Sequence, residues 1–289
     1  MTPLLLLLLC SLAKTEFSTV LIGGTDPYDM LDSVEVVTTV NKTCTHSVSN
    51  FPLARYGLAA AHLSFPFSND ILACGGENRG PWGTSRQACY HFRSSEDRWI
   101  EAPPMNFPRF DATIHTFESG LPAQPGFNLV LGGGESAVEI LPGGGGGGWT
   151  EVEAARLPYY TFQGSCSVVV TSSTSAYTSY IHLLGGQEDG TSWATNSHYR
   201  LKVDSNGVSN EGWELMHHMP LALQDHGCLA ADIGQTSGII VTGGDDELSM
   251  GFSNKAFFYD IELEHWTELR ELPQPRAFHN MGLIGEGVG

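Results

Sequence analysis

The chain has 289 residues, 41% of them hydrophobic, and its 14 Lys and Arg stand against 32 Asp and Glu, a formal net charge of −18. Because binding of phosphate groups needs clustered basic residues, nucleic acids and anionic membrane surfaces are poor partners. The 34 Gly and 15 Pro, without a long segment of period-3.6 apolar spacing, predict an all-β protein.

The first thirteen residues have the pattern of a signal peptide. Residues 4–9 form an apolar run, and Cys10, Ser11 and Ala13 follow it with a small-x-small cleavage pattern. The run is too short to cross a bilayer, and no other segment is long and apolar enough to do so. We therefore expect residues 1–13 to be removed and the protein to be secreted; the alternative is a buried N-terminal strand.

An apolar run that ends in a glycine pair recurs five times along the chain. The second glycines lie about 52 to 58 residues apart. Self-similarity at a fixed period of this length indicates one supersecondary unit that is repeated. The pairs are Gly23 and Gly24, Gly75 and Gly76, Gly132 and Gly133, Gly185 and Gly186, and Gly243 and Gly244.

Two further marks recur in phase with the glycine pairs. In the second repeat, strand a covers 56–63, strand b covers 71–74, strand c covers 87–93, and strand d lies around Trp99. Four short strands separated by turns predict one antiparallel sheet per repeat. An Arg or Gln opens each strand a, at Arg55, Arg109, Gln163, Gln224 and Arg276. A Trp lies in four d strands, at Trp99, Trp149, Trp213 and Trp266, and Tyr259 precedes the last of them by seven residues.

Together these marks resemble the kelch repeat. The resemblance covers about 17–289 and implies a single kelch-type β-propeller in which each repeat forms one four-stranded blade. It also implies that the glycines, Trp residues and Tyr259 are structural, because blades pack on one another through large apolar side chains. The blade units are 17–50 plus 276–289, 51–104, 105–153, 157–217 and 219–271.

The order of the strands predicts how the propeller closes. The first repeat starts at strand b, and one additional strand a, residues 276–284, follows the last repeat. Pairing of 276–284 with 18–22 would close a ring of five blades and leave no exposed sheet edge. The alternative is a truncated version of a six- or seven-bladed propeller.

The cysteines fit an exported protein. Cys74 ends one strand and Cys89 lies in the next, so a disulfide between them is expected, because neighbouring antiparallel strands bring such pairs into range. Cys166 and Cys228 occupy equivalent places in successive repeats and form a second possible pair. Cys44 is left over. Asn41 lies in the one N-x-Ser/Thr sequon and is a glycosylation candidate.

Recognition is expected on the face formed by the b–c loops and the d-to-a connections. Variable loops on a rigid repeat scaffold are a common place for binding residues, and exposed Tyr, Trp and Arg are frequent hot spots. We expect a secreted, non-enzymatic kelch protein that binds a protein or glycan through this face. The candidates are Asp26, Tyr28, Arg55, Glu77, Asn78, Arg79, Trp82, Arg109, Asp189, Trp193, Asp245, Asp246 and Arg276.

Two alternative functions remain open. Some kelch propellers are enzymes, so a propeller enzyme acting on a sugar in the central funnel is one; an intracellular substrate adaptor is the other. A copper site needs several His and Tyr ligands, and the eleven His, which include His226 and His279, show no ligand spacing on one strand. We expect no catalytic residue, metal or cofactor.

Overall fold

The structure is a computed structural model. It describes residues 7–12, 16–25, 29–38, 44–63, 70–78, 87–118, 126–143, 147–159, 164–171, 178–187, 193–204, 207–246 and 251–282. The chain forms two compact units, Met1–Tyr160 and Thr161–Gly289, and each is described by itself. No helix among the described residues is long and apolar enough to span a membrane.

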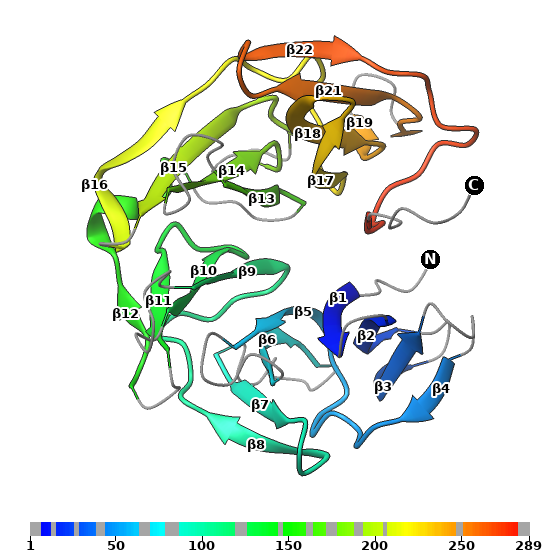
Figure 1. The fold of residues 1–289 in the computed structure, drawn as a ribbon, viewed down its shortest axis with the longest axis vertical. Coiled ribbons are helices and arrows are strands. Elements are labelled where there is room, and N and C mark those ends of the chain that lie inside the picture. Colours follow the sequence, from blue (N-terminus) through cyan, green and yellow to red (C-terminus); the bar gives the residue numbers. More distant parts are fainter. Residues whose placement is uncertain are drawn as a thin grey trace. The chain divides into compact units, whose positions relative to one another are not determined.

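Unit 1 contains three four-stranded antiparallel sheets (Figure 1). The strands of the first are β1 (Leu7–Leu12), β2 (Glu16–Thr25), β3 (Met30–Thr38) and β4 (Cys44–Ser47). Those of the second are β5 (Tyr56–His62), β6 (Ile71–Glu77), β7 (Cys89–Arg93) and β8 (Arg98–Ala102). The third contains β9 (Ala112–Phe117), β10 (Phe127–Gly132), β11 (Glu139–Pro142) and β12 (Thr150–Glu151), followed by the short 3-10 helix η2 (Glu153–Ala155).

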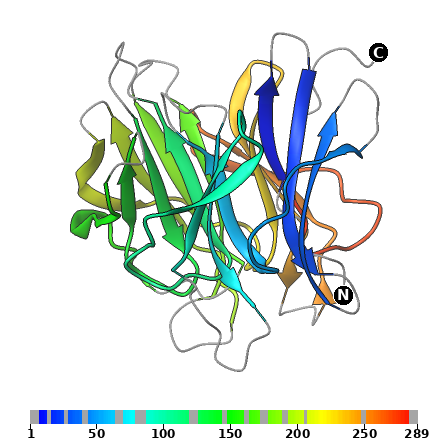
Figure 2. The ribbon, with the colours of Figure 1, turned by 90° about the horizontal axis from the view of Figure 1, so that it is seen from below.

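Unit 2 contains two more sheets of the same kind and a short hairpin. One sheet consists of β13 (Cys166–Thr171), β14 (Ser179–Leu184), β15 (His198–Asp204) and β16 (Gly207–Leu215). The other consists of β17 (Gly227–Ile233), β18 (Thr236–Thr242), β21 (Ala256–Asp260) and β22 (His265–Glu268). The hairpin of β19 (Asp245–Asp246) and β20 (Gly251–Phe252) follows β18 directly. Consecutive strands of each sheet run in opposite directions (Figure 2).

The all-β class and the four-stranded antiparallel sheets are confirmed, but the strand that completes the first sheet differs from the prediction. β1 pairs with β2, with Leu8 opposite Val20 and Cys10 opposite Ser18. The described part of the predicted C-terminal strand, 276–282, contains no strand. A hairpin between neighbouring segments closes a much shorter loop than a pairing of the two chain ends, so its entropic penalty is smaller. The predicted pairing of 276–284 with 18–22 is therefore wrong, because β2 pairs with β1 on one edge and with β3 on the other.

The glycine pairs fix how one repeat meets the next. Gly76 has φ +76°, a conformation that favours glycine, and its N–H donates to the Arg109 carbonyl at 3.1 Å. A Cβ at Gly76 would lie 2.8 Å from the Tyr56 carbonyl oxygen. Gly244 repeats the arrangement in unit 2, where its N–H donates to the Arg276 carbonyl at 2.8 Å. The repeated glycines are therefore structural.

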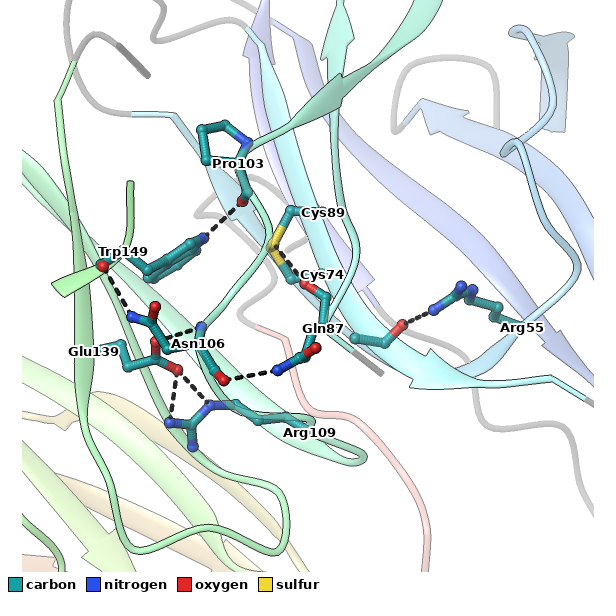
Figure 3. The surroundings of a disulfide bond; sticks show 10 residues. Arg55, Cys74, Gln87, Cys89, Pro103, Asn106, Arg109, Glu139 and Trp149 are labelled. Carbon is teal, nitrogen blue, oxygen red and sulfur yellow. Dashed lines mark hydrogen bonds and ion pairs between the residues drawn. A yellow bond between two sulfur atoms is a disulfide. The ribbon is translucent and has the colours of Figure 1, made fainter. Parts of the chain in front are cut away.

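The arginines that open the repeats of unit 1 point into the interior (Figure 3). Arg55 is 1% exposed and donates to the Gly75 carbonyl at 2.7 Å. Arg109 is fully buried; it donates to the Gly132 carbonyl at 2.7 Å and forms an ion pair with the buried Glu139 at 3.1 Å. These guanidinium groups hold the ends of the b strands.

Three tryptophans each connect their sheet to the chain segment that precedes that sheet. The Trp99 indole N–H donates to the Ser49 carbonyl at 3.0 Å, and the Trp149 indole donates to the Pro103 carbonyl at 3.0 Å (Figure 3). The Trp266 indole N–H likewise donates to the His217 carbonyl at 3.0 Å. Their large rings also fill the hydrophobic cores.

Both predicted disulfides are present. Cys74 and Cys89 are opposite each other on β6 and β7, with a Cα–Cα distance of 4.1 Å (Figure 3). Cys166 on β13 and Cys228 on β17 are 5.9 Å apart between Cα atoms, and their bond joins the two sheets of unit 2. The first disulfide therefore acts within a sheet and the second between sheets.

Candidate functional site

The residues predicted for a binding face have different places in the structure. Asp26, Tyr28, Asn41, Arg79, Trp82 and Asp189 lie outside the described residues. Arg55 and Arg109 are buried, so they are not on a surface, whereas Arg276 is exposed. Glu77 and Asn78 are half-buried at the end of β6, where the Tyr56 hydroxyl donates to Glu77 at 3.2 Å. The remaining candidates, Trp193, Asp245 and Asp246, lie in unit 2.

Unit 2 brings two histidines together at the start of β17. His226 immediately precedes β17, and His279 lies on the C-terminal segment that follows β22. A Cβ at Gly243 would lie 2.7 Å from His279 Cε1, and one at Gly244 would lie 2.8 Å from His226 Cβ. The glycine pair at the end of β18 therefore lies against the His279 ring and the Cβ of His226, whose own Cε1 would lie 2.7 Å from a Cβ at Gly185.

The His226 imidazole is buried without satisfying its polar atoms. The residue is 6% exposed, and neither Nδ1 nor Nε2 has a hydrogen-bond partner among the described residues. Burial and, to a smaller extent, the nearby His279 lower the pKa of His226 to about 4, and the backbone of Leu223 opposes this shift. At neutral pH the ring is uncharged, so it presents an unprotonated nitrogen.

The His279 ring is oriented by a hydroxyl group. Its Nε2 lies 2.8 Å from Thr242 Oγ1, and that hydroxyl donates to Met281 Sδ at 3.2 Å. His279 Nδ1 has no hydrogen-bond partner among the described residues. Burial and then Arg276 lower the pKa of His279, which keeps the ring neutral.

Gly227, the first residue of β17, allows the side chains of His279 and Met281 to lie close to the backbone of this strand. A Cβ at Gly227 would lie 2.8 Å from His279 Nε2 and 3.0 Å from Met281 Cγ. The described residues hold no group of three or more His, Cys, Asp and Glu that could bind a metal ion. The cluster here is of another composition: the imidazoles of His226 and His279, the thioether of Met281 and the hydroxyl of Thr242.

Polar and aromatic residues adjoin His226 and His279 in the chain and lie in the β19–β20 hairpin. Asp245 is paired with Phe252 in the β19–β20 hairpin, and its backbone also exchanges hydrogen bonds with Gln224, at 2.7 and 3.2 Å. The Phe278 N–H donates to the Asp225 carbonyl at 2.8 Å. Phe252 and Phe278 meet edge to face, with ring centroids 6.3 Å apart.

Two other polar clusters have a structural character. In unit 1, Asp70 accepts hydrogen bonds from both the backbone and the hydroxyl of Ser94 and lies 2.8 Å from His91 Nε2. The aspartate stands between the hydroxyl and the imidazole, which is not the order that nucleophile activation needs. In unit 2, His182 and His198 contact each other at 2.8 Å in the interior.

The proximity of His226 and His279 could not be predicted from the repeat marks. His226 lies two residues after Gln224, whereas His279 lies three after Arg276, so the two histidines differ by one residue in phase. Met281 and Thr242 carry no signal in the sequence either, because their contacts depend on the path of the C-terminal segment.

Comparison with known proteins gives a fold but no family. No protein-family model matches the chain, and no curated protein matches its sequence. Among solved structures it is similar to a fungal alcohol oxidase of the AA5 family in complex with copper, with a TM-score of 0.67 and 15% identity. The match covers 96% of this chain and 54% of that one, so the chain spans about half the length of the oxidase.

These findings correct three predictions. The assignment to the kelch-repeat family is wrong, because no family model matches and the structural neighbour is an AA5 oxidase. The non-enzymatic binder of protein or glycan, and with it the expectation that the chain is not an enzyme, are overturned by the same likeness to an alcohol oxidase. The glycine, arginine and tryptophan marks reflect the geometry of successive sheets, which does not determine function.

Proposed function

We propose that this protein is a copper-dependent oxidase of alcohols and that His226 and His279 hold the copper ion. The observation that carries the proposal is the pair of imidazoles whose ring nitrogens His226 Nδ1, His226 Nε2 and His279 Nδ1 lack hydrogen-bond partners among the described residues. The thioether of Met281 contacts the same Thr242 hydroxyl as His279. The fold shared with a copper-containing alcohol oxidase supports the same class of reaction.

The residues present fit copper. Imidazole nitrogen and thioether sulfur are donors that copper accepts well. Metal binding requires a neutral imidazole, and the pKa of His226, lowered to about 4, keeps that ring neutral at physiological pH. A buried polar atom without a partner costs about 1–3 kcal/mol, so a ligand at the His226 nitrogens would recover that free energy.

Copper would supply the electron transfer of the reaction, in which an alcohol loses two electrons and two protons and dioxygen takes them up as hydrogen peroxide. The residues of the chain provide the site. The Thr242 hydroxyl orients the His279 ring. Replacing a group that orients a metal ligand in this way commonly changes metal affinity by about 10–100-fold. The burial of His226 keeps water away from one side of the site.

We further propose that the enzyme is exported and that its sheets are blades of a β-propeller. Two disulfides support export, because such bonds persist in oxidising compartments. The regular hydrogen bonds from Gly76 and Gly244 to the next repeat support the blade arrangement. Leu7–Leu12 form β1 of the first sheet, so N-terminal sequencing of secreted material tests whether residues 1–13 are removed or retained as a strand.

The oxidase activity is tested by peroxide formation. Purified protein is loaded with copper and supplied with a panel of primary alcohols in air. We expect peroxide and aldehyde in equal amounts from wild type, and loss of both in His226→Ala and His279→Ala. His265→Ala, which changes an exposed histidine of the same unit, is the matched control and keeps full activity. Copper-loaded wild type that forms no peroxide with any alcohol would contradict the proposal.

A further inference from the structure

We propose that the site binds copper preferentially as the cuprous ion, and that Met219 and Met281 supply the sulfur donors that select this oxidation state. The inference rests on the copper site proposed above and names the form of the ion that the site retains. It is based on the groups that lie beside the rings of His226 and His279.

The first thioether, that of Met219, meets the His226 ring over Gly185. A Cβ at Gly185 would lie 2.7 Å from His226 Cε1 and 3.0 Å from Met219 Cε. Cε1 stands between the two ring nitrogens and Cε is bonded to the sulfur, so the donor atoms of both residues flank one point that a glycine leaves open. Met219 is 2% exposed and His226 is 6% exposed, so this point lies in the interior of unit 2.

The second thioether, that of Met281, lies beside the His279 ring. A Cβ at Gly227 would lie 2.8 Å from His279 Nε2 and 3.0 Å from Met281 Cγ. The Thr242 hydroxyl contacts both residues, His279 Nε2 at 2.8 Å and Met281 Sδ at 3.2 Å. Gly227 directly follows His226, so the second imidazole and its thioether lie against the residue next to the first imidazole.

The donors of this site are uncharged. No Asp, Glu or Cys in the described part of the chain forms a group of three potential metal ligands with the two histidines. Asp225, which precedes His226, directs its carboxylate elsewhere, because Oδ1 would lie 2.5 Å from a Cβ at Gly164. The charged group that acts on His279 is the guanidinium of Arg276, which together with burial lowers the pKa of that ring.

An uncharged donor set that includes sulfur favours Cu(I) over Cu(II). Thioether sulfur is a soft donor that selects Cu(I), whereas Cu(II) prefers tetragonal sites of nitrogen and oxygen ligands. The cost of burying an ion without a counter-charge rises with the square of its charge, so it is much larger for the doubly charged ion. The positive charge of Arg276 also repels a doubly charged ion more strongly than a singly charged one.

Metal competition tests the inference without a measurement of activity. Binding of Cu(I), kept reduced with ascorbate under anaerobic conditions, is measured against bicinchoninate, and binding of Cu(II) in air is measured against glycine. We expect wild type to bind Cu(I) at least about 100-fold more tightly than Cu(II). The double variant Met219→Leu/Met281→Leu has side chains of similar volume and should lose about tenfold or more in Cu(I) affinity, with little change for Cu(II). Met216→Leu, which changes another buried methionine of unit 2, is the matched control and should bind both ions as wild type does.

X-ray absorption at the copper edge provides a readout that a purely structural role of the methionines would not change. The spectrum of Cu(I)-loaded wild type and of Met216→Leu should contain a sulfur neighbour of copper, and that of the double variant should not. Unfolding curves show whether the double variant folds. The wild-type spectrum decides the question if it does not.

The outcomes separate this inference from the oxidase proposal. Cu(II) bound as tightly as Cu(I), a Cu(I) preference that the folded double variant retains, or a wild-type spectrum without a sulfur neighbour overturns the inference, even when the copper-loaded protein forms peroxide. A Cu(I) preference and a sulfur neighbour that the double variant loses support it, even when no alcohol is oxidised; in that case the oxidase proposal alone fails.

Discussion

At the scale of single residues, the strongest interactions of unit 1 are made by the charged groups in its interior. Arg109 and Glu139 are both fully buried, and Arg109 also donates to the carbonyls of Gly132 and Ala137 at 2.7 Å. Burial lowers the pKa of Arg109, and the charge of Glu139 opposes that shift, so the carboxylate compensates the buried guanidinium.

Removal of Glu139 should therefore be far more damaging than removal of an exposed acid. Glu139→Gln leaves the guanidinium of Arg109 buried without a counter-charge, and we expect a loss of about 3–5 kcal/mol in the free energy of unfolding. Glu151→Gln breaks the exposed contact with Arg156 and should change stability by about 0–1 kcal/mol. Urea denaturation of both variants measures the difference; similar losses would show that Arg109 is not desolvated.

The buried histidines of unit 2 make its stability depend on pH. Burial lowers the pKa of His198 to about 4 and that of His182 well below its usual value. The unfolded chain therefore takes up protons first as the pH falls below 6.5, so stability is lost between about 6.5 and 4, by about 3 kcal/mol for His198.

The pH dependence is tested by replacing one ring. Denaturant unfolding of wild type at several pH values should show a decline in stability below 6.5, and His198→Asn should show a smaller one. His265→Asn changes an exposed histidine and should leave the slope of wild type. An identical slope in His198→Asn and wild type would contradict the assignment of the effect to this residue.

At the scale of elements, the two disulfides constrain the chain to different extents. Cys74 and Cys89 are 15 residues apart and lie on neighbouring strands, whereas Cys166 and Cys228 are 62 apart and join two sheets. The longer loop has more conformational entropy in the unfolded chain, so its closure should stabilise the fold more, by about 4 against about 3 kcal/mol.

Paired replacement by alanine measures each contribution. We expect Cys166→Ala with Cys228→Ala to lower the free energy of unfolding by about 1 kcal/mol more than Cys74→Ala with Cys89→Ala. Calorimetric unfolding of the two double variants provides the comparison. The opposite order would show that strand pairing within the sheet, rather than loop length, sets the effect.

Much of the element structure could be predicted from the sequence, because its signals are local. Gly76 and Gly244 mark positions where the backbone needs a positive φ, and the disulfides follow from strand adjacency. The burial of Arg55 could not be predicted, since it depends on carbonyl groups twenty residues away in the chain. The strand that completes the first sheet is β1 and not the expected C-terminal strand, because β1 and β2 are neighbours in the chain and their pairing closes only a short loop.

At the scale of the whole molecule, the sequence pattern predicts the antiparallel sheets but not the functional site. The repeat marks predicted antiparallel sheets, and these are shared with an alcohol oxidase at 15% identity. They did not predict the site, because the contacts of His226, His279 and Met281 depend on how the last segment of the chain returns to β17. Function therefore has to be argued from these side chains.

The central claim is that His226 and His279 bind copper, and equilibrium dialysis with elemental analysis tests it most directly. Wild type and His265→Ala should retain one copper ion per chain at micromolar free copper. His226→Ala and His279→Ala should each lose at least about 100-fold in affinity, an energy of about 2.7 kcal/mol, while near-wild-type unfolding curves show that they fold. Copper retained equally by wild type, His226→Ala and His279→Ala, or absent from folded wild type, would contradict the claim.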